Sequence, residues 1–261
     1  MLRSLDVFAG IGNFTLAAKM VGHIETLQFV EIDKYCQKIL NKHYPYVPIH
    51  SDIRTYKGEL GSYDLITGGF PCLDISSQNP KGLGLDGPRS GLFYELVRVI
   101  REVRPKYLLL ENVVHILYKD KGRHMGRVLW ELQQAGYDVE WATISAESVG
   151  APHLRERVWF VGYRSDLKNT YSHSTRFQEL FFTPISETQK QCTRLLTKTG
   201  TYWQHKPRVD RVLNGSTKGI HRTNRVRVLG NSIVPQVAAI PLTKIVNIDK
   251  LIYEIQNSKD C

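Results

Sequence analysis

Short apolar runs alternate with amphipathic stretches through the first 164 residues of the chain. The runs that predict strands are residues 5–8, 26–31, 65–67, 107–111, 141–144 and 157–162. The stretches that predict helices are residues 13–20, 34–41, 92–103 and 125–135. Strands that alternate with helices are typical of a parallel α/β sheet. The pattern therefore predicts an α/β domain in this part of the chain.

The pattern changes after Arg164. Residues 165–206 are rich in Thr, Ser, Gln and Lys, and their aromatic residues follow no clear period. This composition predicts a small module or an ordered loop rather than another strand–helix unit. Between Pro235 and Ile255 apolar residues recur with helical spacing, and Pro241 is expected to kink that helix.

Charge is concentrated in one segment of the chain. Residues 164–227 hold thirteen Lys or Arg and four Asp or Glu, a net charge of +9 out of the total of +10. A near-neutral body with one basic segment is typical of a nucleic-acid-binding protein. A solvated surface without a partner is the alternative. The overall composition, 42% hydrophobic and 23% charged, is that of an ordinary globular protein.

The cysteines and the apolar runs limit which classes of protein this chain can belong to. Cys36, Cys72, Cys192 and Cys261 are widely spaced, without the spacing of a zinc site. They predict a reduced intracellular protein with no metal. The sequence contains no run of about 18 apolar residues, so it predicts no membrane span. The N-terminus lacks the long apolar stretch of a secretory signal.

A glycine-containing turn follows the first predicted strand. The sequence DVFAGIG, residues 6–12, places Gly10 and Gly12 in that turn, where a ligand can approach the backbone closely. Glu31 ends the second strand about 20 residues later, as a carboxylate that binds a ribose does. Asp52 and Ile53 follow the next region and are expected at an adenine edge. These features predict a dinucleotide or S-adenosylmethionine, and a plain tight turn is the alternative.

Four other side chains are candidates for chemistry. Cys72 follows Pro71 at the exit of a buried strand, and Glu111 ends the apolar strand 107–111, beside Asn112. A carboxylate in apolar surroundings has a raised proton affinity. Arg155 and Arg157 are expected on one face of the strand that begins there. Taken singly, these residues could be an inert thiol, a helix cap and exposed strand-end arginines.

The order of these motifs resembles that of the cytosine-5 DNA methyltransferase family. The resemblance rests on DVFAGIG, Glu31, Asp52-Ile53, GGFPC, ENV, R-E-R and LGNSIVPQVA, and covers residues 5–163 and about 208–240. It implies a Rossmann-like S-adenosylmethionine-dependent methyltransferase sheet with a small inserted basic recognition module and a C-terminal helix that returns to the catalytic domain. The expected domains are 1–164 (catalytic and cofactor-binding), 165–206 (target recognition) and 207–261 (return segment).

The resemblance also implies a role for each catalytic residue. Cys72 would add to C6 of a flipped-out cytosine, so that C5 can attack the methyl sulfonium. Glu111 would protonate or hydrogen-bond N3, and Arg157 would hold O2. Arg155 would orient Glu111 or a phosphate. In the loop of residues 76–93, Ser76 and Arg89 are expected to contact DNA.

On the cofactor side, the resemblance implies a pocket for S-adenosylmethionine. Glu31 would bind the ribose, Ile32 would stack on adenine, and Asp52-Ile53 would read the adenine edge. The residues expected to line this pocket are Phe8, Ala9, Gly10, Gly12, Glu31, Ile32, Asp52, Ile53, Gly69, Pro71, Leu92, Asn231 and Ser232.

Some positions depart from the family pattern. Leu73 and His153 each replace a usual glutamine, Asn13 stands where a second glycine is frequent, and the recognition region is very short. The expected partner is double-stranded DNA. The expected protein is a monomer, prokaryotic or phage-encoded, that acts in the cytoplasm at the nucleoid. Alternatives are a tRNA cytosine-5 methyltransferase, whose Cys-Phe-Thr signature is lacking here, a non-catalytic DNA-binding homologue, and an NAD-linked dehydrogenase, which would leave Cys72 without a role.

Overall fold

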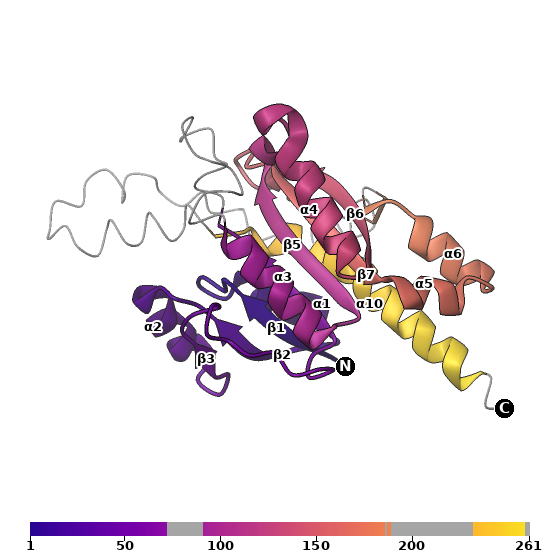
Figure 1. Ribbon diagram of the computed structural model, residues 1–261, viewed down its shortest axis with the longest axis horizontal. Coiled ribbons are helices and arrows are strands. Elements are labelled where there is room, and N and C mark those ends of the chain that lie inside the picture. Colours follow the sequence, from indigo (N-terminus) through magenta and orange to yellow (C-terminus); the bar gives the residue numbers. More distant parts are fainter. Residues whose placement is uncertain (72–90, 186, 189–231, 259–261) are drawn as a thin grey trace, which may run out of the picture.

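A seven-stranded sheet forms the centre of the protein, with the strand order β3-β2-β1-β4-β5-β7-β6. The computed structural model describes residues 1–71, 91–185, 187–188 and 232–258 (Figure 1). The strands are β1 (Leu2–Val7), β2 (Ile24–Val30), β3 (Ile49–His50), β4 (Leu65–Gly69), β5 (Tyr107–Val113), β6 (Tyr137–Ile144) and β7 (Arg157–Arg164). This sheet confirms the predicted α/β class.

One strand corrects the expectation of a parallel sheet. The pairs from β3 to β5 are parallel, but β7 lies antiparallel between β5 and β6. Parallel neighbours need a long crossover, usually a helix, whereas antiparallel neighbours do not. Between β6 and β7 the chain forms only the 3-10 helix η4 (Ala146–Val149), so β7 returns in the opposite direction.

Helices cover both faces of the sheet. They are α1 (Asn13–Val21), α2 (Lys34–His43), α3 (Leu92–Val103), α4 (Arg123–Gln134), α5 (Ser165–Tyr171), α6 (Thr175–Phe182) and α10 (Pro235–Asn257), with 3-10 helices η2 (Val114–Leu117) and η3 (Lys119–Gly122). Alternate residues of β5 separate the two cores: Tyr107 and Leu109 pack with α1 and α10, and Leu108 and Leu110 pack with α3 and α4 (Figure 1). None of the described helices is long and apolar enough to cross a membrane.

The segment after Arg164 begins with helices that the sequence pattern did not predict. Tyr171 and Phe177, from α5 and α6, are buried in the same apolar cluster as α10. The rings of Phe177 and Phe181 stack with centroids 5.5 Å apart. Residues 165–185 therefore pack on the side of the core that contains α1 and α10. The domain boundaries at residues 164 and 206 stay predictions.

A buried lysine fastens this segment to the sheet. The Lys244 Nζ atom, on α10, donates hydrogen bonds to the carbonyl oxygens of Phe181 at 3.1 Å and Thr183 at 2.6 Å. It also pairs with the carboxylate of Glu140, which accepts a hydrogen bond from the Ile185 amide at 2.7 Å. Burial lowers the pKa of Lys244, and the Glu140 carboxylate opposes that shift.

We expect Lys244→Ala to reduce the free energy of unfolding by about 3 kcal/mol, because it leaves Glu140 and two carbonyl groups without their buried partner. Urea denaturation measures the loss. Lys250→Ala, at an exposed position of the same helix, is the matched control and should change the free energy by less than about 0.5 kcal/mol. Equal effects of the two substitutions would contradict this account of Lys244.

Candidate active site

The predicted catalytic residues that the structure describes meet at the carboxyl ends of β4 and β5. Gly69 pairs with Glu111 across these two parallel strands, and Val113 pairs with Arg157 across β5 and β7. Ligand sites of open α/β sheets lie outside this edge. Strand register therefore explains how residues 69, 111 and 157, far apart in sequence, become neighbours.

Glu111 and Arg157 form a largely buried ion pair. The Arg157 Nε atom lies 2.9 Å from Oε1 of Glu111, and only 8% of Glu111 is exposed. Burial raises the pKa of Glu111, although the positive charges of Arg157 and Arg155 oppose that shift. The result is a carboxyl group with a high proton affinity, fixed in direction by an arginine. Such a group is suited to donating a proton or a hydrogen bond.

Gly68 and Gly69, directly before Phe70, have neighbouring atoms too close to allow a side chain. Their backbone conformation does not itself require glycine. A Cβ atom on Gly68 would lie 2.8 Å from the carbonyl oxygen of Val7, and one on Gly69 would lie 2.9 Å from Oε2 of Glu111. Both distances are too short for a side chain. Gly68 thus lets β4 pack against β1, and Gly69 leaves room for the carboxylate of Glu111.

Asn112 has a positioning role that its side-chain contacts define. Its Nδ2 atom donates to the carbonyl oxygen of Phe70 at 3.1 Å, and its Oδ1 atom accepts from the Val113 amide at 2.9 Å. Phe70 itself packs on Phe93 of α3, with ring centroids 4.9 Å apart. The stretch that leads into Pro71 is therefore held on both sides. The sequence drew attention to Asn112 but gave no partner for it.

Arg155 lies just before β7 instead of on it, which corrects the expectation of two arginines alternating on one strand face. Its backbone has a φ of 29°. Its Nη2 atom donates to the carbonyl oxygen of Ser232, three residues before the start of α10. Asn13, at the start of α1, similarly donates from Nδ2 to the carbonyl oxygen of Ile233 at 2.8 Å. The departure from glycine at Asn13 thus ties the glycine turn to the predicted last motif.

The glycine turn is held by Glu31. Its Oε2 atom accepts from the Gly10 amide at 2.7 Å, and its Oε1 atom accepts from the Asp33 amide at 2.7 Å. Gly10 and Gly12 have φ values of 56° and 82°, which favour glycine. Burial raises the pKa of Glu31, and the two amides oppose that shift. Each carboxylate oxygen keeps further acceptor capacity for a ligand hydroxyl.

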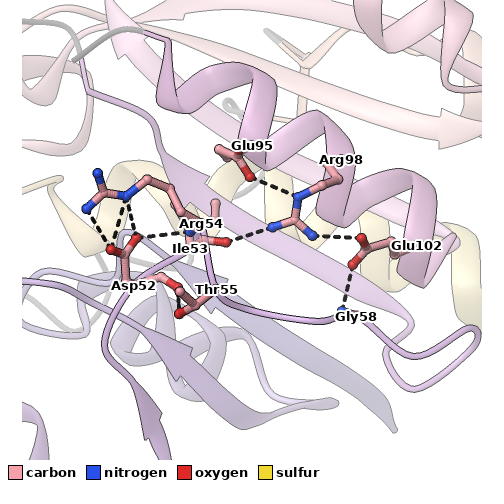
Figure 2. A network of polar contacts seen from close by, with 8 residues as sticks. All are labelled: Asp52, Ile53, Arg54, Thr55, Gly58, Glu95, Arg98 and Glu102. Atoms are coloured by element: carbon pink, nitrogen blue, oxygen red, sulfur yellow. Dashed lines mark hydrogen bonds and ion pairs between the residues drawn. The ribbon is translucent and has the colours of Figure 1, made fainter. Parts of the chain in front are cut away.

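The side chains of the remaining predicted cofactor residues differ in how far they are exposed to a ligand. Ile32 is 58% exposed, as a residue that stacks on a ligand would be. Asp52 pairs with Arg54 at 2.6 Å, and the side chain of Ile53 is buried (Figure 2). Any contact of Ile53 with a ligand would therefore use its main chain. Phe8 has a φ of 55°, Ala9 is buried, and Pro71 and Leu92 are half-buried.

An arginine network supports the Ile53 turn from α3. The Arg98 Nη2 atom donates to the carbonyl oxygen of Ile53 at 2.7 Å, and Arg98 also pairs with Glu95 and Glu102 (Figure 2). Glu102 accepts from the Gly58 amide at 2.8 Å. The stretch that carries Asp52 and Ile53 is thereby fixed relative to the helix that follows residues 72–90.

Asp6 is a buried acid that sequence reasoning did not single out. It is fully buried, and its two oxygens accept hydrogen bonds from the hydroxyls of Thr15 at 3.2 Å and Thr67 at 3.1 Å. Burial raises its pKa to about 8, with a smaller contribution from the charge of Glu31. The sequence feature that could have identified Asp6 is its position as a charged residue in the otherwise apolar predicted strand 5–8, at the start of DVFAGIG.

The raised pKa of Asp6 predicts a pH dependence of stability. The folded protein keeps the Asp6 proton up to about pH 8, whereas an unfolded chain releases it near pH 4. The free energy of unfolding should therefore fall between pH 5 and 7, on the order of 1 kcal/mol per pH unit from this residue. Asp6→Asn should flatten that slope in urea titrations. An unchanged slope would contradict the assignment.

Several predicted site residues lie outside the described residues: Cys72, Ser76, Arg89 and Asn231, together with the departure Leu73. Ser232 is described, and it is half-buried. Among the described residues, no group of three or more His, Cys, Asp or Glu could hold a metal ion.

Comparison with known proteins identifies the family. The family model of the C-5 cytosine-specific DNA methylases matches residues 2–218. The chain belongs to the C-5 cytosine-specific DNA methylase family. This result confirms the resemblance inferred from the order of the motifs, and the family match includes both strands that carry Gly69 and Glu111.

Two bacterial type II methyltransferases are among the proteins that the chain is similar to. The chain is 36% identical over 171 residues to the type II methyltransferase M1.ScrFI of Lactococcus lactis subsp. cremoris, covering 65% of this chain and 43% of the relative. It is 35% identical over 161 residues to M2.BsuMI of Bacillus subtilis, covering 60% and 41%. The chain thus spans less than half the length of these relatives.

A solved structure extends the likeness in fold over nearly the whole chain. The S. pombe Dnmt2 methyltransferase superposes with a TM-score of 0.61, covering 95% of this chain and 99% of that one, at 16% sequence identity. Because the identity is low, this likeness concerns the fold alone. It confirms the Rossmann-like methyltransferase fold that the motifs implied.

Proposed function

We propose that the chain transfers a methyl group from S-adenosylmethionine to C5 of a flipped-out cytosine in a specific double-stranded DNA sequence. The observation that carries the proposal is the buried Glu111–Arg157 pair beside Gly69, three residues before Cys72. This pair offers a proton donor and a fixed cation to the same ligand, as an activated cytosine ring requires.

The chain's residues fit the cofactor. Glu31 keeps acceptor capacity for ribose hydroxyls, and Ile32 presents an exposed apolar side chain. Among the described residues, no atom lies within 4 Å of where a Cβ atom on Gly10 would be, which leaves space beside the turn. S-adenosylmethionine, when bound, supplies an electrophilic methyl group. Gly10, Gly12, Glu31, Ile32 and Asp52 would hold it at the edge of β1 and β2.

The reaction starts at the cytosine ring, whose C5 atom is a poor nucleophile. The Cys72 thiolate forms a bond to C6, and electron density moves toward N3 and O2. Glu111 donates its proton or a hydrogen bond to N3, and Arg157 holds O2 with its fork of N–H groups. C5 then becomes an enamine carbon that can form a bond to the methyl group, and S-adenosylhomocysteine would leave as the second product.

The second half of the reaction restores the aromatic ring. A general base takes the proton from C5, the bond between Cys72 and C6 breaks, and N3 returns to Glu111 the proton that it received. The products at the ring are 5-methylcytosine and the free Cys72 thiolate. Cys72 has to reach the face of the cytosine ring, and Glu111 and Arg157 have to reach its edge. Because these positions cannot be reached inside a stacked duplex, the cytosine has to leave the stack before Cys72 can add.

The experiment is a comparison of labelled-methyl transfer to duplex DNA and to tRNA. We expect label in DNA as 5-methylcytosine and none in tRNA. Label in tRNA alone would support the tRNA methyltransferase instead. Binding of duplex DNA without any transfer would support a non-catalytic DNA-binding protein.

A further inference from the structure

An exposed basic turn joins β5, which carries Glu111, to α4. We call it the β5–α4 turn and define it as Tyr118, Lys121, Arg123 and Arg127, all of them exposed. Within the described residues, neither Lys121 nor Arg123 forms an ion pair. The acid of this turn, Asp120, is engaged by His124 at 2.6 Å between Oδ2 and Nε2. Arg127 pairs with Glu131 at 3.3 Å, so the turn presents the positive charges of Lys121 and Arg123 to solvent without a direct ion pair to any described residue.

The backbone of the turn has an unfavourable conformation. Asp120, Lys121 and Gly122 have φ values of 49°, 57° and 81°, all in the left-handed region. Glycine adopts this region readily and aspartate tolerates it, but a lysine there is strained by its Cβ atom. Strain of this kind often accompanies a functional position. At position 121 a glycine would suit the backbone better, so the lysine calls for a reason other than stability.

The turn lies at the same edge of the sheet as the candidate active site. Figure 1 places the coil that precedes α4 beyond the arrowhead of β5. The guanidinium of Arg127 lies over the ring of Tyr94, in the first turn of α3, at 5.9 Å from its centroid. The neighbouring Phe93 packs on Phe70, directly before Pro71. Contacts therefore connect the turn to the stretch that leads into Cys72.

We propose that the β5–α4 turn binds the phosphate backbone of duplex DNA next to the target base. The inference rests on the proposed function, and it adds a contact surface outside the basic segment of residues 164–227. Lys121 and Arg123 supply the charges, and the exposed ring of Tyr118, 69% accessible, supplies a hydroxyl donor. Such contacts position DNA without reading its sequence.

Lys121→Gly tests the proposal because it should weaken DNA binding without lowering the stability of the protein. Removal of the strained side chain should keep or raise the melting temperature. Affinity for a duplex that the wild-type protein methylates should fall about threefold at low salt, and about tenfold in the double variant Lys121→Gly/Arg123→Ser. The slope of log affinity against log salt should become less steep by about 0.9 for each lost phosphate contact.

Two controls separate charge from structure. Arg123→Lys keeps the charge and should keep most of the affinity. Lys250→Ser removes an exposed lysine from the C-terminal half of α10 and should leave both affinity and salt slope unchanged. Unchanged affinity and slope in the double variant, while the wild-type protein methylates the same duplex, would overturn the proposal. Failure of the wild-type protein to methylate DNA would instead count against the proposed function.

Discussion

Cys72→Ala is expected to abolish methyl transfer, by at least about a thousandfold, while leaving S-adenosylmethionine binding unchanged. Without the thiolate no bond forms at C6, and C5 stays too weak a nucleophile to accept the methyl group. Loss of an enzyme's nucleophile alone removes most of its catalysis. Labelled-methyl transfer to DNA measures the rate, and calorimetric titration with the cofactor measures binding.

Cys36→Ala provides the matched control for Cys72. Cys36 is a buried cysteine of α2, and its removal should leave the rate of transfer unchanged apart from a modest loss of stability. Transfer that persists in Cys72→Ala would refute the assignment of the nucleophile. Loss of cofactor binding in that variant would show that the residue acts on the pocket instead.

Glu111→Gln is expected to lower the rate of transfer by about 10²- to 10³-fold, in the range that one general acid contributes. Glutamine has nearly the same shape, but it cannot give a proton to N3. The raised pKa of Glu111 also predicts that wild-type activity declines as pH rises through that pKa, because the proton is then lost. Glu111→Gln should lack this decline. Rates measured across pH on the same duplex test both statements.

Glu254→Gln is the control for that series. Glu254 pairs with Arg176 at an exposed site on α10, so its neutralisation should change neither the rate nor the pH profile. A Glu111→Gln protein with the wild-type rate would contradict the role of Glu111. A reduced rate with an unchanged pH profile would mean that Glu111 only shapes the pocket.

The fold was largely predictable because its strands are short and buried. Residues 107–110 are apolar in an unbroken run, and β5 indeed packs against helices on both faces. The antiparallel direction of β7 was not predictable, because it depends on the absence of a crossover helix after β6. The helices α5 and α6 were missed because each spans only about two turns, too short for a period to emerge from a polar segment.

The candidate site was predictable where a motif supplied the residue type, and not where a role depends on a distant partner. Glu111 and Arg157 were expected at one cytosine ring, but Arg155 was expected to orient Glu111 or a phosphate, whereas the residue that pairs with Glu111, at 2.9 Å, is Arg157. Asp6 was missed, since its environment depends on hydroxyls from α1 and β4. The purpose of Asn13 likewise became visible only through its bond to Ile233, 220 residues away.

Bisulfite sequencing of plasmid DNA from a bacterial host that expresses the chain tests the central claim most directly. The account predicts that cytosines within one recurring sequence resist conversion, and that the same plasmid is fully converted when the host expresses Cys72→Ala. Complete conversion in the wild-type culture, with the folded protein and S-adenosylmethionine present, would contradict it.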